Sequence, residues 1–241
     1  MPSQKSKVES RKSGFREHRP RAAIFDIGAT LVTGPPVAPN KVIASLLDGV
    51  GPAEVASVIM TRELACADGV CAALESRFGA MGERARAGIT ELWEAQSSAA
   101  VALDGASETV LALKRRGIRV GLLSDIWSPY YAGIQQALPE VIRAADAIVL
   151  SCRTGARKPD AANFLTALSK LGIGPREAVM VGDTYSHDIL PALQLGMRAV
   201  WVLARPDREA ESIIKVLNGD LPTPTATVST IAEVAALALW D

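Results

Sequence analysis

The sequence has few of the side chains that build zinc sites or disulfides. Of its 241 residues, two are histidines and three are cysteines. Cys66, Cys71 and Cys152 do not form the closely spaced pairs that zinc sites use. The two histidines are His18, in a basic N-terminal stretch, and His187, which excludes a two-histidine metal centre. We therefore expect free thiols rather than a disulfide or a thiolate metal site.

The chain also lacks a long hydrophobic run and a net charge. No window approaches the ~18 consecutive apolar residues that a membrane span requires. Basic and acidic residues are matched at 26 each, but residues 1–21 hold seven basic and two acidic ones. The remainder is mildly acidic, which argues against nucleic-acid binding as the main task. The basic stretch over residues 1–20 predicts a disordered tail, and we expect a cytoplasmic protein without a nucleic-acid or membrane partner.

What the sequence does contain is an alternation of apolar runs and amphipathic stretches. Hydrophobic residues make up 49% of the chain, as in soluble globular proteins. Five near-continuous apolar runs and a weaker sixth predict strands that are covered on both faces of a parallel sheet. These runs are residues 22–26, 118–124, 147–151, 178–182, 199–203 and 225–229. With helical patterns between them, the runs predict a doubly wound α/β fold.

Two of the intervening helices carry start and stop signals. One is predicted to begin at the capping residue Ser107 and to end at Gly117. The other is predicted to begin at Asp160 and to end at Gly172. Its predicted buried face holds four apolar side chains: Phe164, Leu165, Leu168 and Leu171.

Residues 34–103 interrupt this alternation, because they contain helical patterns and no convincing strand. Asn40 is predicted to cap the first of these helices, and Pro52 suits the first turn of the second. About 70 residues of helix are too many for a single crossover between two strands. The simplest account is a helical cap, residues 34–103, inserted into an α/β core formed by residues 21–33 and 104–241.

Polar side chains lie at or just beyond the ends of the predicted strands. Asp26 ends the first strand, Ser124 the second, Lys158 follows the third, and Asp183 and Asp188 follow the fourth. Three aspartates at one sheet edge would repel one another unless a cation joined them, and all-oxygen ligands suit Mg²⁺. A serine hydroxyl and a lysine charge are able to hold phosphoryl oxygens. This set predicts phosphoryl transfer from a small phosphorylated substrate, with Asp26 as the nucleophile of an aspartyl-phosphate intermediate.

The segments FDIGATLV, LLSD, RKPD and GDTYSHD resemble, in this order and spacing, the four motifs of the haloacid dehalogenase-like hydrolase superfamily. The match covers residues 22–203. The resemblance implies a Rossmann-like core, a helical cap inserted after the first motif, and Mg²⁺-dependent phosphatase activity. It implies that Asp26 is the nucleophile, that Ser124 binds phosphate and that Lys158 stabilises charge. Asp183 and Asp188 would form the acidic metal site.

Residue 28 departs from this pattern. The phosphatases that the chain resembles usually have a second aspartate there, which protonates the leaving oxygen and then activates water. The same position ligates Mg²⁺ through its backbone carbonyl, which Gly28 retains. Loss of a general acid–base group matters, because such a group is worth roughly 10²–10⁴-fold in rate.

Three consequences of Gly28 stay open. The substrate's leaving group could need little protonation, as in sugar 1-phosphates or acyl phosphates. Another group could substitute, with Asp125 and Tyr185 nearby in the motifs. The activity could also be vestigial.

Two alternatives to a phosphatase follow from the same residues. A metal-independent haloacid-type dehalogenase would share the nucleophile, the serine and the lysine, but it would have no need of Asp183 and Asp188. A non-catalytic binding protein of the same fold would explain Gly28, but it would have no need to retain Asp26 and Lys158.

Overall fold

The computed structural model describes residues 19–241. Most of the expected disordered tail, residues 1–18, lies outside the described residues. Arg19 and Pro20, the last two residues of the predicted tail, belong to the described residues. Arg19 donates a hydrogen bond from Nε to the carbonyl oxygen of Trp240 (2.8 Å), and Pro20 is buried.

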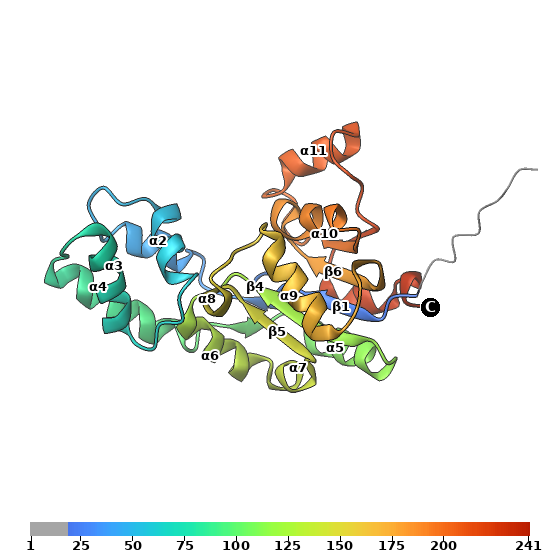
Figure 1. Cartoon of the computed structure of the whole chain (residues 1–241), viewed down its shortest axis with the longest axis horizontal. Helices are drawn as coiled ribbons and strands as arrows, with labels where there is room; N and C mark the ends of the chain where they lie inside the picture. The colour runs from blue at the N-terminus through green and yellow to red at the C-terminus, as the bar shows by residue number, and fades with distance from the viewer. Residues whose placement is uncertain (1–18) are drawn as a thin grey trace, which may run out of the picture.

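A six-stranded parallel sheet forms the centre of the structure, in the order β5-β4-β1-β6-β7-β8 (Figure 1). The strands are β1 (Ala22–Phe25), β4 (Arg119–Ser124), β5 (Ala147–Leu150), β6 (Ala178–Gly182), β7 (Arg198–Val202) and β8 (Ala226–Val228). Each corresponds to one of the six predicted runs. β1 is flanked by β4 and β6. Its carboxyl end therefore lies where the strand order reverses, the usual place for a ligand in such a sheet.

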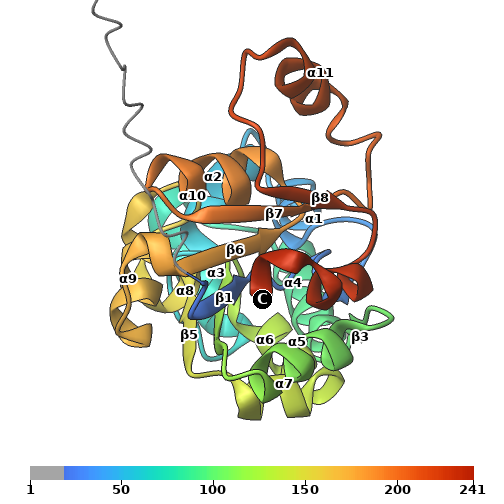
Figure 2. The same cartoon turned by 90° about the vertical axis from the view of Figure 1, so that its right-hand side faces the viewer.

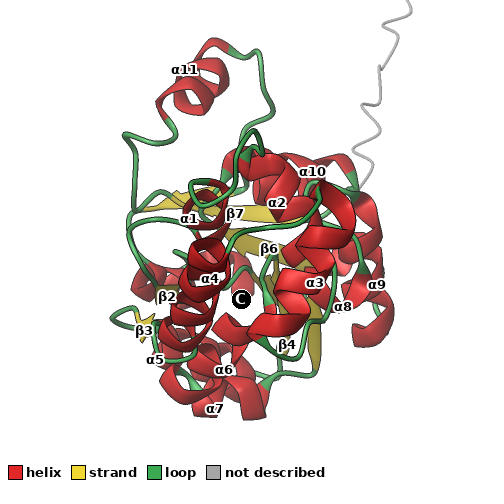
Figure 3. Cartoon of the chain, turned by 90° about the vertical axis from the view of Figure 1, so that its left-hand side faces the viewer, coloured by secondary structure: helices red, strands yellow, loops and turns green. Residues whose placement is uncertain are grey.

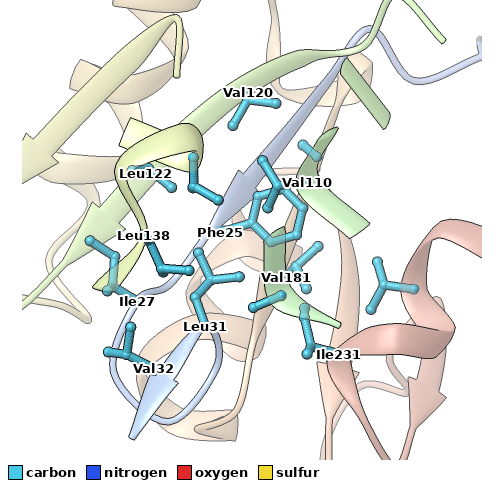
Figure 4. Close-up of a cluster of buried hydrophobic side chains, with 14 of the residues drawn as sticks. Phe25, Ile27, Leu31, Val32, Val110, Val120, Leu122, Leu138, Val181 and Ile231 are labelled. Carbon is cyan, nitrogen blue, oxygen red and sulfur yellow. The ribbon is translucent and has the colours of Figure 1, made fainter. Parts of the chain in front are cut away.

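Helices cover both faces of this sheet (Figure 2). On one face, α9 (Ala161–Leu171) and α10 (Leu190–Gln194) pack on Ala22 and Ile24 of β1. On the other face, Ala23 and Phe25 meet α5 (Ala106–Arg115), α6 (Ser128–Ala137), α7 (Pro139–Ala144) and the 3₁₀ helix η3 (Ile231–Ala236). Figure 4 shows Phe25 among the side chains of this second cluster. Alternate residues of β1 thus face opposite layers, which confirms the predicted doubly wound, Rossmann-like α/β fold.

The two helices with sequence signals form, but with differences. Asp160 caps α9 by accepting a hydrogen bond from Ala162 N (2.8 Å), and Gly172 ends it in the left-handed conformation. Leu165 is 49% exposed, so its predicted place on the buried face is wrong. One residue after the buried Phe164 on a helix of 3.6 residues per turn, it points about 100° away. The prediction for Ser107 is also wrong, because α5 begins after Gly105, whose left-handed backbone (φ 79°) turns the chain into the helix earlier.

The segment between β1 and α5 is mainly helical. It contains α1 (Pro39–Ala44), α2 (Pro52–Ile59), α3 (Ala67–Phe78) and α4 (Glu83–Gln96). Figure 3 shows these helices in front of the carboxyl edge of the sheet. The expectation of no strand within residues 34–103 is wrong, since β3 (Val101–Ala102) pairs with β2 (Val32–Thr33). This short antiparallel pair joins the two ends of the segment where it leaves and rejoins the sheet.

Local details of this segment also differ from the prediction at one position. Pro52 opens α2 as predicted. Asn40 does not cap α1, because that helix begins at Pro39 with Ala38 as its N-cap. The Asn40 side chain instead donates a hydrogen bond to Pro52 O (3.0 Å), so it connects α1 to the start of α2.

The remaining elements are short. They are α8 (Ser151–Thr154), α11 (Ala210–Asn218), η1 (Pro175–Glu177), the π-helical turn η2 (Tyr185–Ile189) and η4 (Ala238–Trp240). The chain ends in the 3₁₀ helices η3 and η4, and the side chain of Trp240 in η4 is completely buried. Across residues 19–241, none of the helices combines the length and the apolar character that crossing a bilayer requires.

Candidate active site

Asp26 lies directly after β1 at the carboxyl edge of the sheet, and it is 5% exposed. Its backbone N–H donates to Val181 O (2.9 Å), which continues the β1–β6 ladder by one residue. The chain then turns sharply, with Ala29 in the left-handed region at φ 60°. This conformation costs a residue with a Cβ roughly 1–2 kcal/mol. The Thr30 hydroxyl reaches back from the turn to Asp26 Oδ2 (3.4 Å), so the turn restrains the carboxylate that begins it.

Lys158 reaches Asp26 from the loop between α8 and α9. Its Nζ lies 2.6 Å from Asp26 Oδ1 and 2.6 Å from Asp188 Oδ1. The side chain is 5% exposed, so both ion pairs are shielded from water. The Lys158–Pro159 peptide bond is cis, and the backbone N–H of Lys158 donates to Asp125 Oδ1 (3.0 Å). Residues from three separate motifs of the sequence thus meet around one ammonium group.

Three buried carboxylates form the acidic part of the site. Asp26, Asp183 and Asp188 each offer an oxygen, and these oxygens lie within 4.8 Å of one another. An all-carboxylate set of this spacing fits a hard divalent cation such as Mg²⁺. Gly28 lines the same pocket and has a backbone carbonyl to add. The donor set therefore fits the metal that the sequence predicts.

Burial and mutual repulsion control the ionisation of these groups. Burial raises the pKa of Asp26 to about 6; Lys158 opposes the rise and the Asp188 charge adds to it. Burial also raises the pKa of Asp183 and of Asp188. Burial alone would lower the pKa of Lys158, but the charges of Asp188 and Asp26 raise it further than burial lowers it. The lysine therefore stays cationic, and a further positive charge would stabilise the ionised carboxylates of the cluster.

A pocket of about 180 Å³ joins these residues to Ser124, which ends β4. All five residues that the sequence predicts at the strand ends line it, together with Gly28. Four further lining residues are Thr184, His187, Arg205 and the already considered Asp125. Arg205 forms an ion pair with Asp183. The sequence analysis did not identify Arg205 as a site residue. The one feature that could have indicated it is its position shortly after the end of the predicted strand 199–203.

The two groups considered as substitutes for a second aspartate differ in placement. The Tyr185 side chain is 1% exposed, and its hydroxyl donates to Pro222 O. Asp125 lines the pocket, but its carboxylate is held by the Lys158 N–H and lies 3.6 Å from Arg157 Nε. The structure therefore removes Tyr185 as a candidate proton donor and leaves Asp125 in the pocket as an acceptor of hydrogen bonds.

Gly28 itself borders open space. A Cβ added at this position would have no heavy atom within 4 Å, apart from the adjoining chain. Packing around the Cβ position therefore does not explain the glycine.

Comparison with known proteins agrees with this geometry. A family model described as haloacid dehalogenase-like hydrolase matches residues 20–196, well over half of the chain. The chain belongs to the haloacid dehalogenase-like hydrolase family.

Two curated relatives and one solved structure illustrate the similarity. Glyceraldehyde 3-phosphate phosphatase of Pyrococcus furiosus is 33% identical over 97 residues, 40% of each chain. Phosphoserine phosphatase of Thermus thermophilus is 35% identical over 117 residues, 45% of this chain and 43% of the relative. The match thus spans less than half the length of either relative. A family hydrolase from Deinococcus radiodurans, solved with bound phosphate and sodium, has a TM-score of 0.57 at 22% identity, covering 91% of this chain and 96% of that one. At that identity the likeness supports the fold alone.

Proposed function

We propose that this protein is a Mg²⁺-dependent phosphatase that hydrolyses a small phosphorylated metabolite through an aspartyl-phosphate intermediate. The observation that carries the proposal is the meeting of a buried nucleophile candidate, one lysine and two further carboxylates in a single pocket. The phosphatase names of the two curated relatives support the same class of reaction.

In the first step, an oxygen of Asp26 attacks phosphorus and forms a new P–O bond. The bond from phosphorus to the leaving oxygen breaks, and the leaving oxygen takes the electron pair. The Ser124 hydroxyl and the Lys158 ammonium are assigned to the phosphoryl oxygens that gain charge. In the second step, water attacks the phosphorus of the acyl phosphate and the bond from phosphorus to the Asp26 oxygen breaks. The electron pair of that bond regenerates the Asp26 carboxylate, and the oxygen and protons of the water leave with inorganic phosphate.

Asp26, Asp183, Asp188 and the Gly28 carbonyl would hold Mg²⁺. When bound, the ion would neutralise the acidic cluster and the charge on the phosphoryl group. Without that charge the pocket would repel a phosphate, since four carboxylates, that of Asp125 included, face only the cations of Lys158 and Arg205 among the described pocket residues.

We assign the helical segment, residues 34–103, as a cap that shields the pocket from water, with residues 21–33 and 104–241 as the core. Contacts between this segment and the loop after Ser124 support the assignment. Trp127 donates from Nε1 to Gln96 Oε1 of α4 (3.0 Å), and the Ser128 hydroxyl accepts from Leu64 N (2.9 Å). The segment is thereby connected to the residues that directly follow β4, the strand that ends in the serine assigned to phosphate binding.

Hydrolysis of an aryl phosphate tests the proposal, with and without Mg²⁺, in the wild type and in Asp26→Asn. An aryl leaving group departs without a proton donor, so Gly28 does not mask activity in this assay. We expect turnover that requires Mg²⁺ and is lost in Asp26→Asn. A wild-type turnover rate no higher than that of Asp26→Asn, with Mg²⁺ present, would contradict the proposal. A 2-haloacid offered to the same two proteins would then test the dehalogenase alternative.

A further inference from the structure

The loop between β7 and α11, residues 203–209, contacts the acidic loop after β6 at two points. Near its start, the Arg205 guanidinium pairs with Oδ2 of Asp183. At its end, Glu209 Oε2 accepts a hydrogen bond from the backbone N–H of Tyr185 (3.0 Å). Trp201, in β7, donates from Nε1 to the carbonyl oxygen of Asp183 (2.9 Å). One segment of the chain therefore holds the backbone and the carboxylate of Asp183.

Arg205 complements Lys158 in its choice of partners. Lys158 binds Oδ1 of Asp26 and Oδ1 of Asp188, at 2.6 Å each. Arg205 binds the third carboxylate, that of Asp183, through Oδ2. The other oxygen of Asp183 accepts a long hydrogen bond of 3.4 Å from the Thr184 hydroxyl. Asp183 therefore has one firmly held oxygen and one that is only weakly engaged.

We propose that Arg205 is a positioning residue for cation binding, because it restrains the rotation of the Asp183 carboxylate. With Oδ2 held, the three carboxylates keep the spacing of at most 4.8 Å at which one ion can reach all of them. This inference rests on the proposed Mg²⁺-dependent function. Residues that orient a metal ligand without touching the metal typically contribute 10–100-fold in affinity.

The charge of Arg205 acts in the opposite direction, since a guanidinium near the site repels a cation. The sign of a mutational effect therefore distinguishes positioning from charge. If positioning dominates, removal of Arg205 weakens Mg²⁺ binding. If charge dominates, its removal tightens Mg²⁺ binding.

The test is calorimetric titration of the full chain with Mg²⁺, in the absence of any substrate. Arg205→Met keeps the length of the side chain and removes its donors and charge, whereas Arg205→Lys keeps the charge and one donor group. Arg208→Met is the matched control, because it removes one positive charge from the same loop at an exposed position. We expect 10–100-fold weaker binding in Arg205→Met, partial recovery in Arg205→Lys, and little change in Arg208→Met.

Binding by Arg205→Met that equals or exceeds the wild type overturns the inference. If Arg205→Met does not fold, Arg205→Lys decides, because binding as tight as the wild type overturns the inference and weaker binding supports it. A wild type that binds no Mg²⁺ overturns the metal dependence of the proposed function and the inference with it. If the wild type binds Mg²⁺ and Arg205→Met binds it equally tightly, the inference about Arg205 is overturned but the metal dependence of the proposed function is not.

Discussion

Substitution of Gly28 by aspartate should add a proton donor to the pocket. The backbone at residue 28 accepts a side chain, because an added Cβ would meet no heavy atom within 4 Å and the glycine does not have the positive φ that side chains avoid. The backbone carbonyl assigned to the cation is retained. The new carboxyl group would share a pocket with three buried aspartates, and their negative charge favours its protonated form.

The size of the effect depends on the leaving group. A general acid is worth roughly 10²–10⁴-fold when the leaving oxygen needs a proton. This factor corresponds to about 3–5 kcal/mol in the activation free energy. We therefore expect Gly28→Asp to raise kcat/KM for an alkyl phosphate by about 10²-fold or more. An aryl phosphate, whose leaving group departs as the anion, should change by only a few-fold.

The assay compares kcat/KM for one alkyl and one aryl phosphate at saturating Mg²⁺, in the wild type, Gly28→Asp and Gly28→Asn. The asparagine has the same shape but cannot donate an acidic proton, so it controls for steric and hydrogen-bonding effects. Equal alkyl-phosphate rates in the aspartate and asparagine variants would refute the reasoning. Such a result would mean that Gly28 is not a missing acid, or that another group in the pocket already supplies the proton.

Two further predictions concern stability. In α9, Leu168→Ala should lower the free energy of unfolding by about 2–5 kcal/mol, since Leu168 is 3% exposed. Leu165→Ala should change the free energy of unfolding by less than about 0.5 kcal/mol, because Leu165 is 49% exposed. Equal losses of stability in urea denaturation would contradict the assignment of Leu168 to the buried face and Leu165 to the exposed face. For Asp146, burial acts to raise the pKa, but Lys114 and the backbone N–H of Val120 lower it overall. The folded protein thus binds this proton less readily than the unfolded chain, so the stabilisation is present above the unfolded pKa of about 3.9 and is lost as the pH falls through the lower folded value. The difference in melting temperature between the wild type and Asp146→Asn should therefore shrink between pH 6 and pH 3. A constant difference would contradict a stabilising role for the Asp146 carboxylate.

The regularity of strand spacing explains why the fold could be predicted from the sequence. The runs are five to seven residues long and nearly continuous in apolar character, which favours burial on both faces, and a parallel sheet with helices on both sides provides this. The errors are local. Ser107 and Asn40 are good capping residues, yet Gly105 and Pro39 set the helix starts, because backbone conformation at the neighbouring residue overrides a side-chain preference.

The candidate site, too, has residues that could be predicted from the sequence and residues that could not. Asp26, Ser124, Lys158, Asp183 and Asp188 could be predicted, because the carboxyl ends of parallel strands must lie along one edge of the sheet. Their catalytic roles remain proposals. Tyr185 lies near the motifs in the sequence, as Asp125 does, but its hydroxyl donates a hydrogen bond to the carbonyl oxygen of Pro222.

The sequence by itself determined which polar residues follow the strands, the oxygen-rich character of the candidate cation site and the absence of a carboxylate at residue 28. These properties depend on residue type and on a periodicity of a few residues. Only the tertiary structure decided that Lys158 bridges Asp26 and Asp188, and that Arg205 pairs with Asp183. The physical reason is that these contacts join loops from different strands, whose distances depend on the packing of the whole sheet and not on any local pattern.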